Sequence, residues 1–423
     1  MKKIIFMVSL VLMLGLFSTT VLAQDTVSVM AVWGGQELDA FLKMVEPFEK
    51  ATGIEVQYEG TRDLPTLVTT RLEAGNPPDI VALTGIGMMK QLAEEGDLVN
   101  LSNVLDMDRM QEEYDQTWLD LGTYDDDIYG MYISADIKSL VWYNPKQFEA
   151  KGYEVPESWE ELQALQDEMI ANGDTPWAIG MESGAASGWP GTDWIEDIML
   201  RTAGPEVYDQ WVNHEIPWTD DRVKRAFEIF GKIAKDPEYT YGAPTAVLAT
   251  NFGDAPNALF TDPPHAMMHR QASFITSFIK DNNPDLVAGE DFDIFMFPSI
   301  DEEYGTPVLG AASMFGMMND NDAARAFMRY VSTAGAQSIF VSELGKLGIN
   351  KRINPNVYPD DLTKQMAAML KNASTFRFDG SDSMPGAVGS GAFWQGILDY
   401  ISGEDLDNVL DYIESISEDI YNQ

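Results

Sequence analysis

The sequence contains no cysteine and few basic side chains for its length. Across 423 residues, 27 Lys and Arg stand against 68 Asp and Glu, which gives a formal net charge of −41. Without cysteine the chain forms no disulfide, thiolate metal site, cysteine nucleophile or lipid-anchored cysteine. Because nucleic acids are bound mainly through Lys and Arg on phosphates, this acidity excludes nucleic acid as a general partner.

Histidine is also scarce, and the three residues do not form a metal motif. His265 and His269 stand four positions apart, but Ala, Met and Met lie between them, so the glutamate of a zinc protease is missing. Pro263 and Pro264 just upstream disfavour a regular helix there. His214 is distant from this pair in the sequence, and no third ligand accompanies the pair. We therefore expect no metal and no other cofactor.

Recognised catalytic motifs are missing too. The sequence has no G-x-S-x-G elbow and no phosphate-binding loop, and its paired glycines do not fit a dinucleotide fingerprint. The acidic run at 125–127 lacks the spaced glycine and terminal glutamate of a calcium loop. Two carboxylates are enough for glycoside hydrolysis, and so many acids supply chance pairs. A secreted glycoside hydrolase therefore stays open as an alternative.

What the chain does contain is enough apolar material for a large core. Hydrophobic residues make up 45% and aromatic residues 11% of the sequence, and the length predicts two domains. Residues 1–23 read as a signal peptide, with two lysines, an apolar run from Ile4 to Phe17 and a small-residue cleavage site at Ala23. The apolar run is shorter than the roughly 20 residues that span a bilayer. The mature chain is expected to begin near Gln24.

Strands and helices alternate along the first third of the mature chain. Thr26 to Trp33 predicts a strand, apolar residues at helical spacing follow from Gln36 to Gly53, and the alternation repeats to residue 95. This pattern predicts an α/β unit with a largely parallel sheet. The β-rich run Gly130 to Tyr143 is typical of a strand that crosses between two lobes. A second α/β segment follows, with helices dominating from Asp322 to the end.

Two glycine-rich segments are candidates for ligand contact. The stretch 184–194, GAASGWPGTDW, places Trp189, Asp193 and Trp194 among small residues, and flat aromatic faces stack on sugar rings while carboxylates bind hydroxyls. The tryptophans could equally belong to the core. The stretch 376–394 combines aromatic, guanidinium and carboxylate groups, for which a surface ion pair is the alternative.

Several short motifs occur in a characteristic order. They are E-x-F-x-K-A-T-G-I-x-V at 46–56, PPDIV at 77–81, LAEEGDLVNL at 92–101, and SLVWYN followed by PESWEEL. With the signal peptide, they resemble the family 1 extracellular solute-binding proteins of ABC importers over essentially the whole mature chain. GWPGTDW, HRQASF at 269–274 and RFDGSDSMP at 377–385 resemble the α-glucoside-binding subgroup more specifically.

The resemblance implies an α/β fold of the periplasmic binding protein type II kind. Two α/β lobes, joined by strand hinges, would enclose a ligand cleft. Lobe I is expected to comprise residues 24–135 and 290–332, and lobe II residues 136–289 and 333–423. Carried over position by position, the expected ligand-binding residues are Gln36, Glu37, Arg62, Asp63, Thr84, Asp136, Trp189, Asp193, His269, Gln271, Arg377, Asp379 and Asp382.

The resemblance also implies a function. The chain would be the substrate-binding component of an ABC sugar importer and not an enzyme. It would bind a neutral α-glucoside or disaccharide of the trehalose, sucrose, maltose or glucosylglycerol type by cleft closure, and deliver it to inner-membrane permease subunits with their ATPase. We expect a periplasmic location, since the lipobox cysteine usual in Gram-positive members is missing. We also expect a monomer. A cationic solute such as a polyamine is the further alternative, against which Arg62 and Arg377 argue.

Overall fold

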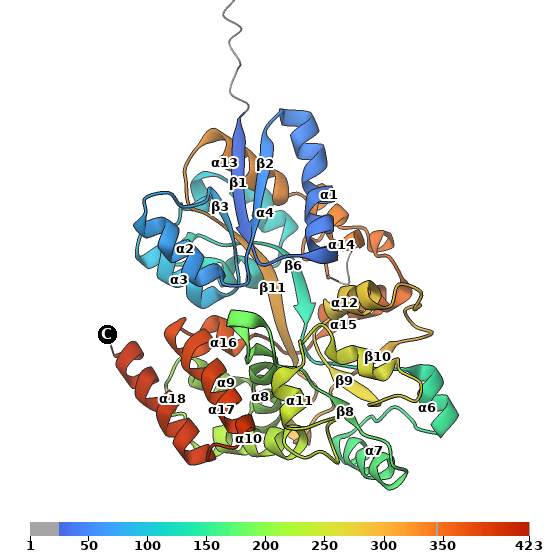
Figure 1. Ribbon diagram of the computed structural model, residues 1–423. Helices are drawn as coiled ribbons and strands as arrows, with labels where there is room; N and C mark the ends of the chain where they lie inside the picture. The colour runs from blue at the N-terminus through green and yellow to red at the C-terminus, as the bar shows by residue number, and fades with distance from the viewer. Residues whose placement is uncertain (1–24, 344–345, 423) are drawn as a thin grey trace, which may run out of the picture.

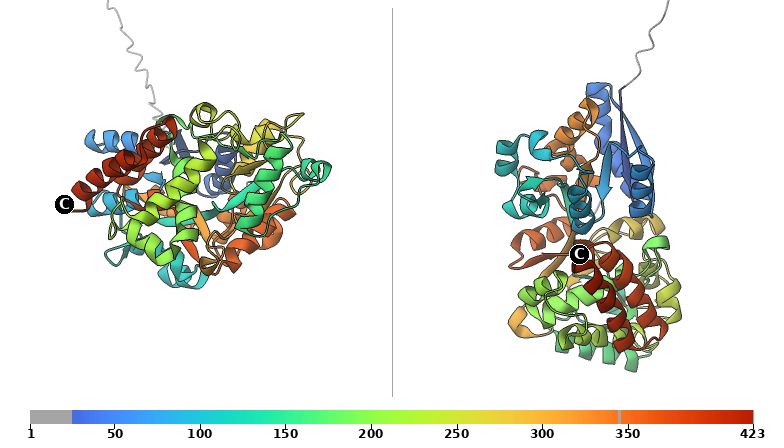
Figure 2. Two further views of the ribbon diagram at one scale, coloured as in Figure 1. Left: turned by 90° about the horizontal axis from the view of Figure 1, so that it is seen from below. Right: turned by 90° about the vertical axis from the view of Figure 1, so that its left-hand side faces the viewer.

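The computed structural model describes residues 25–343 and 346–422. The expected signal peptide, residues 1–23, lies outside the described residues. Figure 1 shows two lobes, one above the other, with the N-terminal strands in the upper lobe and the C-terminal helices in the lower one. Segments far apart in the sequence share the upper lobe, where blue N-terminal elements lie beside orange ones from around residue 320 (Figure 2).

The sheet of the upper lobe is mixed. Its order is β12-β11-β3-β1-β2, and β6 pairs with β11 beside this path. β1 is parallel to β2 and β3, whereas β11 is antiparallel to β3 and β6. Its strands are β1 (Thr26–Ala31), β2 (Glu55–Gly60), β3 (Ile80–Leu83), β6 (Met131–Ile137), β11 (Val308–Met317) and β12 (Phe376–Phe378).

The lower lobe holds a second, smaller sheet. Its order is β10-β7-β9-β8, and only the β8–β9 pair is parallel. The largely parallel sheet predicted from residues 26–95 is confirmed for β1 to β3, whereas β11 makes the upper sheet as a whole mixed. The strands are β7 (Leu140–Tyr143), β8 (Trp177–Ala178), β9 (Met268–Arg270) and β10 (Asp293–Met296), and β4 (Thr123–Tyr124) and β5 (Asp127–Ile128) form a separate hairpin.

Helices cover both sheets. Those that pack in the upper lobe are α1 (Gly35–Thr52), α2 (Leu64–Glu73), α3 (Ile86–Glu94), α4 (Met107–Glu113), α5 (Gln116–Leu121), α13 (Asp322–Val331) and α14 (Ala334–Glu343). The others are α6 (Pro145–Lys151), α7 (Trp159–Ala171), α8 (Trp189–Thr202), α9 (Gly204–Val212), α10 (Asp221–Ala234), α11 (Thr245–Ala249), α12 (Ile275–Asn282), α15 (Asp361–Asn372), α16 (Gly380–Ser383), α17 (Trp394–Ser402) and α18 (Leu406–Tyr421).

Local sequence explains where several helices begin and end. α1 buries Phe41, Val45 and Phe48 on one face and ends at Gly53, whose left-handed backbone lets its N–H donate to the Glu49 carbonyl at 2.8 Å. α7 begins after Ser158, whose hydroxyl accepts from the Glu161 N–H.

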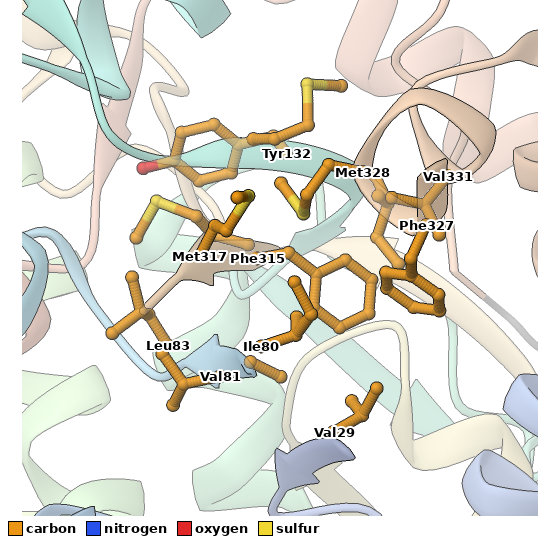
Figure 3. Packing of buried hydrophobic residues seen from close by; sticks show 14 of the residues in the cluster. Val29, Ile80, Val81, Leu83, Tyr132, Phe315, Met317, Phe327, Met328 and Val331 are labelled. Carbon is orange, nitrogen blue, oxygen red and sulfur yellow. The ribbon is translucent and has the colours of Figure 1, made fainter. Parts of the chain in front are cut away.

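Each lobe has its own core, and β11 connects them. In the upper lobe Phe315 of β11 packs against Phe327 of α13 with ring centres 5.6 Å apart, among buried valines, isoleucines and methionines (Figure 3). Leu309, six residues earlier in the same strand, belongs to the core of the lower lobe. β6 likewise passes from the upper core, which includes Ile133, to a third buried cluster, in which Ile137 lies with Trp142 of β7 and Ile294 of β10. Two strands therefore cross between the lobes.

The structure corrects two sequence predictions about elements. The run from Gly130 to Tyr143 is not one strand, because it leaves the upper sheet after Ile137 and enters the lower one at Leu140. Helices dominate from Asp322 onward as predicted, and the short strand β12, which pairs with β11, lies among them. α14 packs against α1 and contributes Phe340 to the upper core, so 334–343 belong with lobe I although they were assigned to lobe II. The remaining lobe boundaries stay a prediction.

Candidate ligand-binding cleft

A cavity of about 450 Å³ lies where the two lobes meet. In the upper lobe its wall comes from the segments that follow β1, β2 and β3, because the carboxyl ends of these parallel strands meet at one edge of the sheet. β6 and β11 line its back, and α8, Phe252 and the segment around α16 and α17 close it from below. The cavity is thus an interdomain cleft, which is where small-molecule sites commonly lie.

Seven of the expected ligand-binding residues line this cavity, and they come from both lobes. Arg62 and Asp63 are exposed after β2, and Thr84 follows β3. The full set is Glu37, Arg62, Asp63, Thr84, Asp136, Trp189 and Asp382.

The other six expected residues do not line the cavity. Gln36 lies half-buried at the start of α1. His269 and Gln271 are buried around β9, where the His269 Nδ1 lies 2.8 Å from the Ala178 carbonyl oxygen and the Gln271 side chain accepts from the next backbone N–H. Burial lowers the pKa of His269 to about 4, so the ring is neutral. β9 is a strand, which removes the basis for reading positions 265 and 269 as one helix face.

Arg377 belongs to a different groove. Its guanidinium donates to both carboxylate oxygens of Asp209 at 2.7 and 2.8 Å, in a second cavity of about 390 Å³. The ion pair named as the alternative for this segment is what the structure shows for Arg377, whereas Asp382 and Trp394 of the same segment line the cleft.

Asp193 and Asp379 lie beneath the floor of the cleft, where Lys138 pairs with both. The Lys138 ammonium lies 2.8 Å from Asp193 Oδ1 and contacts Asp379 Oδ2, and all three side chains are buried. Burial acts to lower the pKa of Lys138, but the carboxylates of Asp193, Asp379 and Asp382 outweigh it and raise the value. Lys138 is therefore a fixed cation, and its own side chain lines the cavity.

A second buried lysine occupies the hinge side of the cleft. Lys346 Nζ lies 3.0 Å from Asp136 Oδ2 and 3.4 Å from Glu37 Oε1, so it links the crossing strand β6 to the start of α1. The other Asp136 oxygen accepts from the Ser273 hydroxyl at 2.9 Å. Burial opposes the charge of Lys346, but Asp136 and Glu37 raise its pKa. Glu37 and Asp136, two of the acids expected to bind the sugar, are thus already paired with a cation.

Aromatic rings form the lower wall. Trp189 packs edge-on against Phe252 with ring centres 5.0 Å apart, and the Lys138 ammonium lies 5.4 Å from the Trp189 ring centre. Arg62 of the upper lobe lies 5.4 Å from the ring centre of Phe252, so the two lobes touch across the cleft. Trp394 lines the same cavity, and its buried indole N–H has no partner among the described residues. A buried unpaired donor on a residue that lines a cleft is an available ligand contact.

Lys138, Lys346 and Trp394 line the cavity but were not among the site residues expected from sequence. Lys138 could have been noticed in the sequence, because Asp136 and Lys138 are the charged residues in the β-rich run from Gly130 to Tyr143. Trp394 ended a segment already named as a candidate. Nothing local marked Lys346, whose partners are 210 and more residues away in the chain.

Residues 34–338 match the bacterial extracellular solute-binding protein family. The chain belongs to this family. Two relatives match most of this solute-binding protein. The osmoprotective compounds-binding protein GgtB of Synechocystis is 46% identical over 92% of this chain and 91% of its own length. The α-glucosides-binding periplasmic protein AglE of Rhizobium meliloti is 40% identical over 90% of this chain and 84% of its own length. The resemblance inferred from the motifs is confirmed, and the function is solute binding rather than glycoside hydrolysis.

Solved structures confirm the two-lobed fold of this solute-binding protein. A chitin oligosaccharide binding protein has a TM-score of 0.82 at 20% identity, covering 95% of this chain and all of its own. The bacterial solute receptor AcbH, described with a preference for β-D-galactopyranose, has a TM-score of 0.81 at 22% identity, covering 94% and 100%. Within residues 25–343 and 346–422, no helix is both long and apolar enough to cross a membrane.

Proposed function

We propose that this solute-binding protein captures a neutral α-glucoside or disaccharide and delivers it to an ABC permease with its ATPase. The observation that carries the proposal is the lining of the interlobe cleft, which combines aromatic rings with charge-compensated polar groups. The names of the two relatives, one for osmoprotective compounds and one for α-glucosides, support the same ligand class. Trehalose, sucrose, maltose and glucosylglycerol are the candidates.

Stacking and hydrogen bonding would act together in such a site. A micromolar dissociation constant needs about −8.2 kcal/mol, whereas one hydrogen bond nets about 0.5–1.5 kcal/mol. Several polar contacts from both lobes are therefore required, with the faces of Trp189 and Trp394 supplying the apolar part. Of the residues expected from sequence, we propose that the seven that line the cavity contact the ligand. We add Lys138, Lys346 and Trp394 to them.

Charge balance within the cleft favours a neutral ligand over a polyamine. The charged side chains of the lining are the carboxylates of Glu37, Asp63, Asp136 and Asp382 and the cations of Arg62, Lys138 and Lys346. A site for a polycation would leave its carboxylates free, but here buried lysines hold Asp136 and Glu37. The overall acid excess is then a solvated coat that keeps a diffusing protein soluble.

Closure around the ligand would couple binding to transport. A sugar that touches both lobes stabilises the closed arrangement, and the permease reads that arrangement. We place the mature protein in the periplasm as a monomer, after removal of residues 1–23. N-terminal sequencing of the exported chain tests the cleavage site, and sedimentation tests the monomer.

Titration calorimetry with the four candidate sugars and with spermidine tests the ligand class. We expect one of the glucosides to bind in the micromolar range, with an affinity that salt leaves unchanged. Spermidine is expected to bind weakly or not at all. Absence of binding tighter than millimolar for every glucoside would overturn the proposal. Strong, salt-sensitive spermidine binding would favour the cationic alternative instead.

A further inference from the structure

Three buried carboxylates meet beneath the floor of the cleft. Asp193 and Glu196 project from α8, and Asp379 precedes α16, so the cluster joins two elements of the lower lobe. One oxygen of each carboxylate lies within 4.8 Å of the others. The exposed fraction is at most 1% for all three side chains. These groups are thus removed from water and close enough to share one ligand.

Two of the carboxylate oxygens in this cluster have no hydrogen-bond partner among the described residues. Asp193 Oδ1 and Asp379 Oδ2 accept from Lys138, and Asp379 Oδ1 accepts from the Ser381 hydroxyl and the Asp382 N–H, both at 2.9 Å. Glu196 Oε1 accepts from the Ser381 N–H at 2.9 Å. Asp193 Oδ2 and Glu196 Oε2 are left buried and unpartnered. An unpaired buried carboxylate oxygen is costly, so these two atoms point to a missing ligand.

The charges around the cluster do not balance either. Within the linked network the cations are Lys138, Arg201 and Arg270, and the carboxylates are Asp193, Glu196, Asp197, Asp379 and Asp382. Asp197 is held by both arginines, and Arg270 also donates to the Asp193 main-chain carbonyl at 2.9 Å. If all five carboxylates are ionised, they exceed the three cations by two negative charges. That arrangement is costly, because burial raises the pKa of Asp193 to about 7, and burial together with neighbouring carboxylates raises the pKa of Glu196 and Asp382 well above their usual values. One divalent cation would neutralise that excess.

We propose that Asp193, Glu196 and Asp379 bind a hard divalent cation of the Ca²⁺ type. The donors are all oxygens, which hard cations prefer, and two oxygens on one Ca²⁺ lie at most about 5 Å apart because each Ca–O distance is about 2.3–2.6 Å. The hydroxyls of Thr192 and Ser381, 3.3 Å apart beside the carboxylates, are additional neutral donors. No metal was expected from the sequence, because the cluster combines positions 193 and 196 with the distant position 379 and matches no calcium loop.

The ion would fasten the floor of the ligand cleft. α8 carries Trp189 into the cavity, and the segment around α16 carries Ser381 and Asp382 into it. A cation between Glu196 and Asp379 links these two elements directly. It would therefore stabilise the lower lobe whether or not a sugar is bound, and the proposal does not depend on the identity of the sugar.

Calcium binding to the full mature chain, freed of metal with a chelator, tests the proposal. At constant ionic strength and pH 8, titration calorimetry and thermal unfolding are expected to show one Ca²⁺ per chain and a Tm that rises with CaCl₂ but not with KCl. The variant Glu196→Gln keeps the shape of the side chain and an acceptor for the Ser381 N–H, but loses the charge. Its Ca²⁺ affinity is expected to fall about tenfold or more, because affinity follows the number of charged ligands.

Glu113→Gln is the matched control, because Glu113 is also a buried carboxylate but lies in the upper lobe with Asn350 and Arg352. It should retain the Ca²⁺-dependent rise in Tm. An equal rise in wild type and Glu196→Gln would assign the effect to the acidic surface and overturn the proposal. Absence of Ca²⁺ binding to the wild type in calorimetry would also overturn it, and would leave protons as the groups that neutralise the cluster.

Discussion

The backbone of Gly87, in the first turn of α3, lies directly against the main-chain carbonyl of Met384. A β-carbon at position 87 would come within 1.9 Å of the Met384 carbonyl oxygen, and one at Gly85 within 2.3 Å of the Asp382 carbonyl oxygen. Gly85, Asp382 and Met384 line the cleft. The two lobes thus meet backbone to backbone at one rim of the ligand site, and only glycine leaves room for that contact.

Gly87→Ala is expected to weaken sugar binding by about tenfold or more, equivalent to about 1.4 kcal/mol, because the methyl group opposes closure but not the open arrangement. Calorimetry measures the affinity, and Tm of the free protein should change little. Gly335→Ala is the control, since its β-carbon would meet only Thr333 Oγ1 at 3.9 Å. Wild-type affinity in Gly87→Ala would show that closure does not need this contact.

Trp394→Phe removes the unpartnered indole N–H and keeps an aromatic face. If that N–H donates to a sugar hydroxyl, binding should weaken by about 0.5–1.5 kcal/mol, the net value of one hydrogen bond. Trp189→Phe is the comparison, because Trp189 also lines the cavity but its indole N–H is not among the buried unpartnered donors of the described residues, so its loss of affinity should be smaller. Equal effects of the two variants in calorimetry would assign both tryptophans to stacking alone.

Lys138→Met is expected to destabilise the fold by about 3–5 kcal/mol, because it removes one partner of a buried charge cluster and leaves Asp193 and Asp379 uncompensated. Denaturant unfolding at pH 8 measures the loss. Lys43→Met, which breaks an exposed pair with Glu343, is the control and should leave the free energy of unfolding nearly unchanged. Similar values for both variants would contradict the buried ion cluster.

The titration of His269 is expected to lower the free energy of unfolding in mild acid. Its pKa is about 4 in the folded protein and about 6.5 when unfolded, so below pH 6.5 the unfolded chain takes up a proton that the buried ring does not. The stabilisation of the folded state by the neutral His269 ring is fully present above pH 6.5 and is lost as the pH falls toward 4. It amounts to about 3 kcal/mol.

The matched variant for this pH dependence is His269→Asn, which keeps a donor toward the Ala178 carbonyl but does not titrate. Unfolding free energies at pH 7.5, 6.0 and 5.0 give the comparison. The difference between wild type and variant should shrink as the pH falls. A constant difference would mean that His269 is protonated in the folded state as readily as in the unfolded chain.

Local pattern was enough to predict much of the fold. The alternation from Thr26 to residue 95 predicted β1 to β3 and the helices between them, because these elements depend on periodicity and on end signals such as Gly53. The split at Lys138 was not predictable, because β6 and β7 are both largely buried strands and the sheet that each one joins is set by distant partners.

The candidate site was predictable by segment but not by side chain. The segments after β1, β2 and β3 line the cleft because parallel strands end at one edge. Glu37, Arg62 and Thr84 in these segments were expected from the family resemblance, position by position. The segment GWPGTDW begins a helix, so Trp189 lines the cavity while Asp193, one turn later, pairs with Lys138 beneath the floor.

By itself the sequence determined the family and its two-lobed solute-binding architecture, since ordered motifs and strand–helix periodicity are local properties. Only the tertiary structure decided which carboxylates line the cleft and which are paired with buried lysines. Lys138 reaches Asp193 and Asp379 across 55 and 241 residues of chain, and no local pattern encodes so distant a pairing. The acid excess therefore divides into a solvated coat and a few buried, paired groups, and burial rather than composition separates the two.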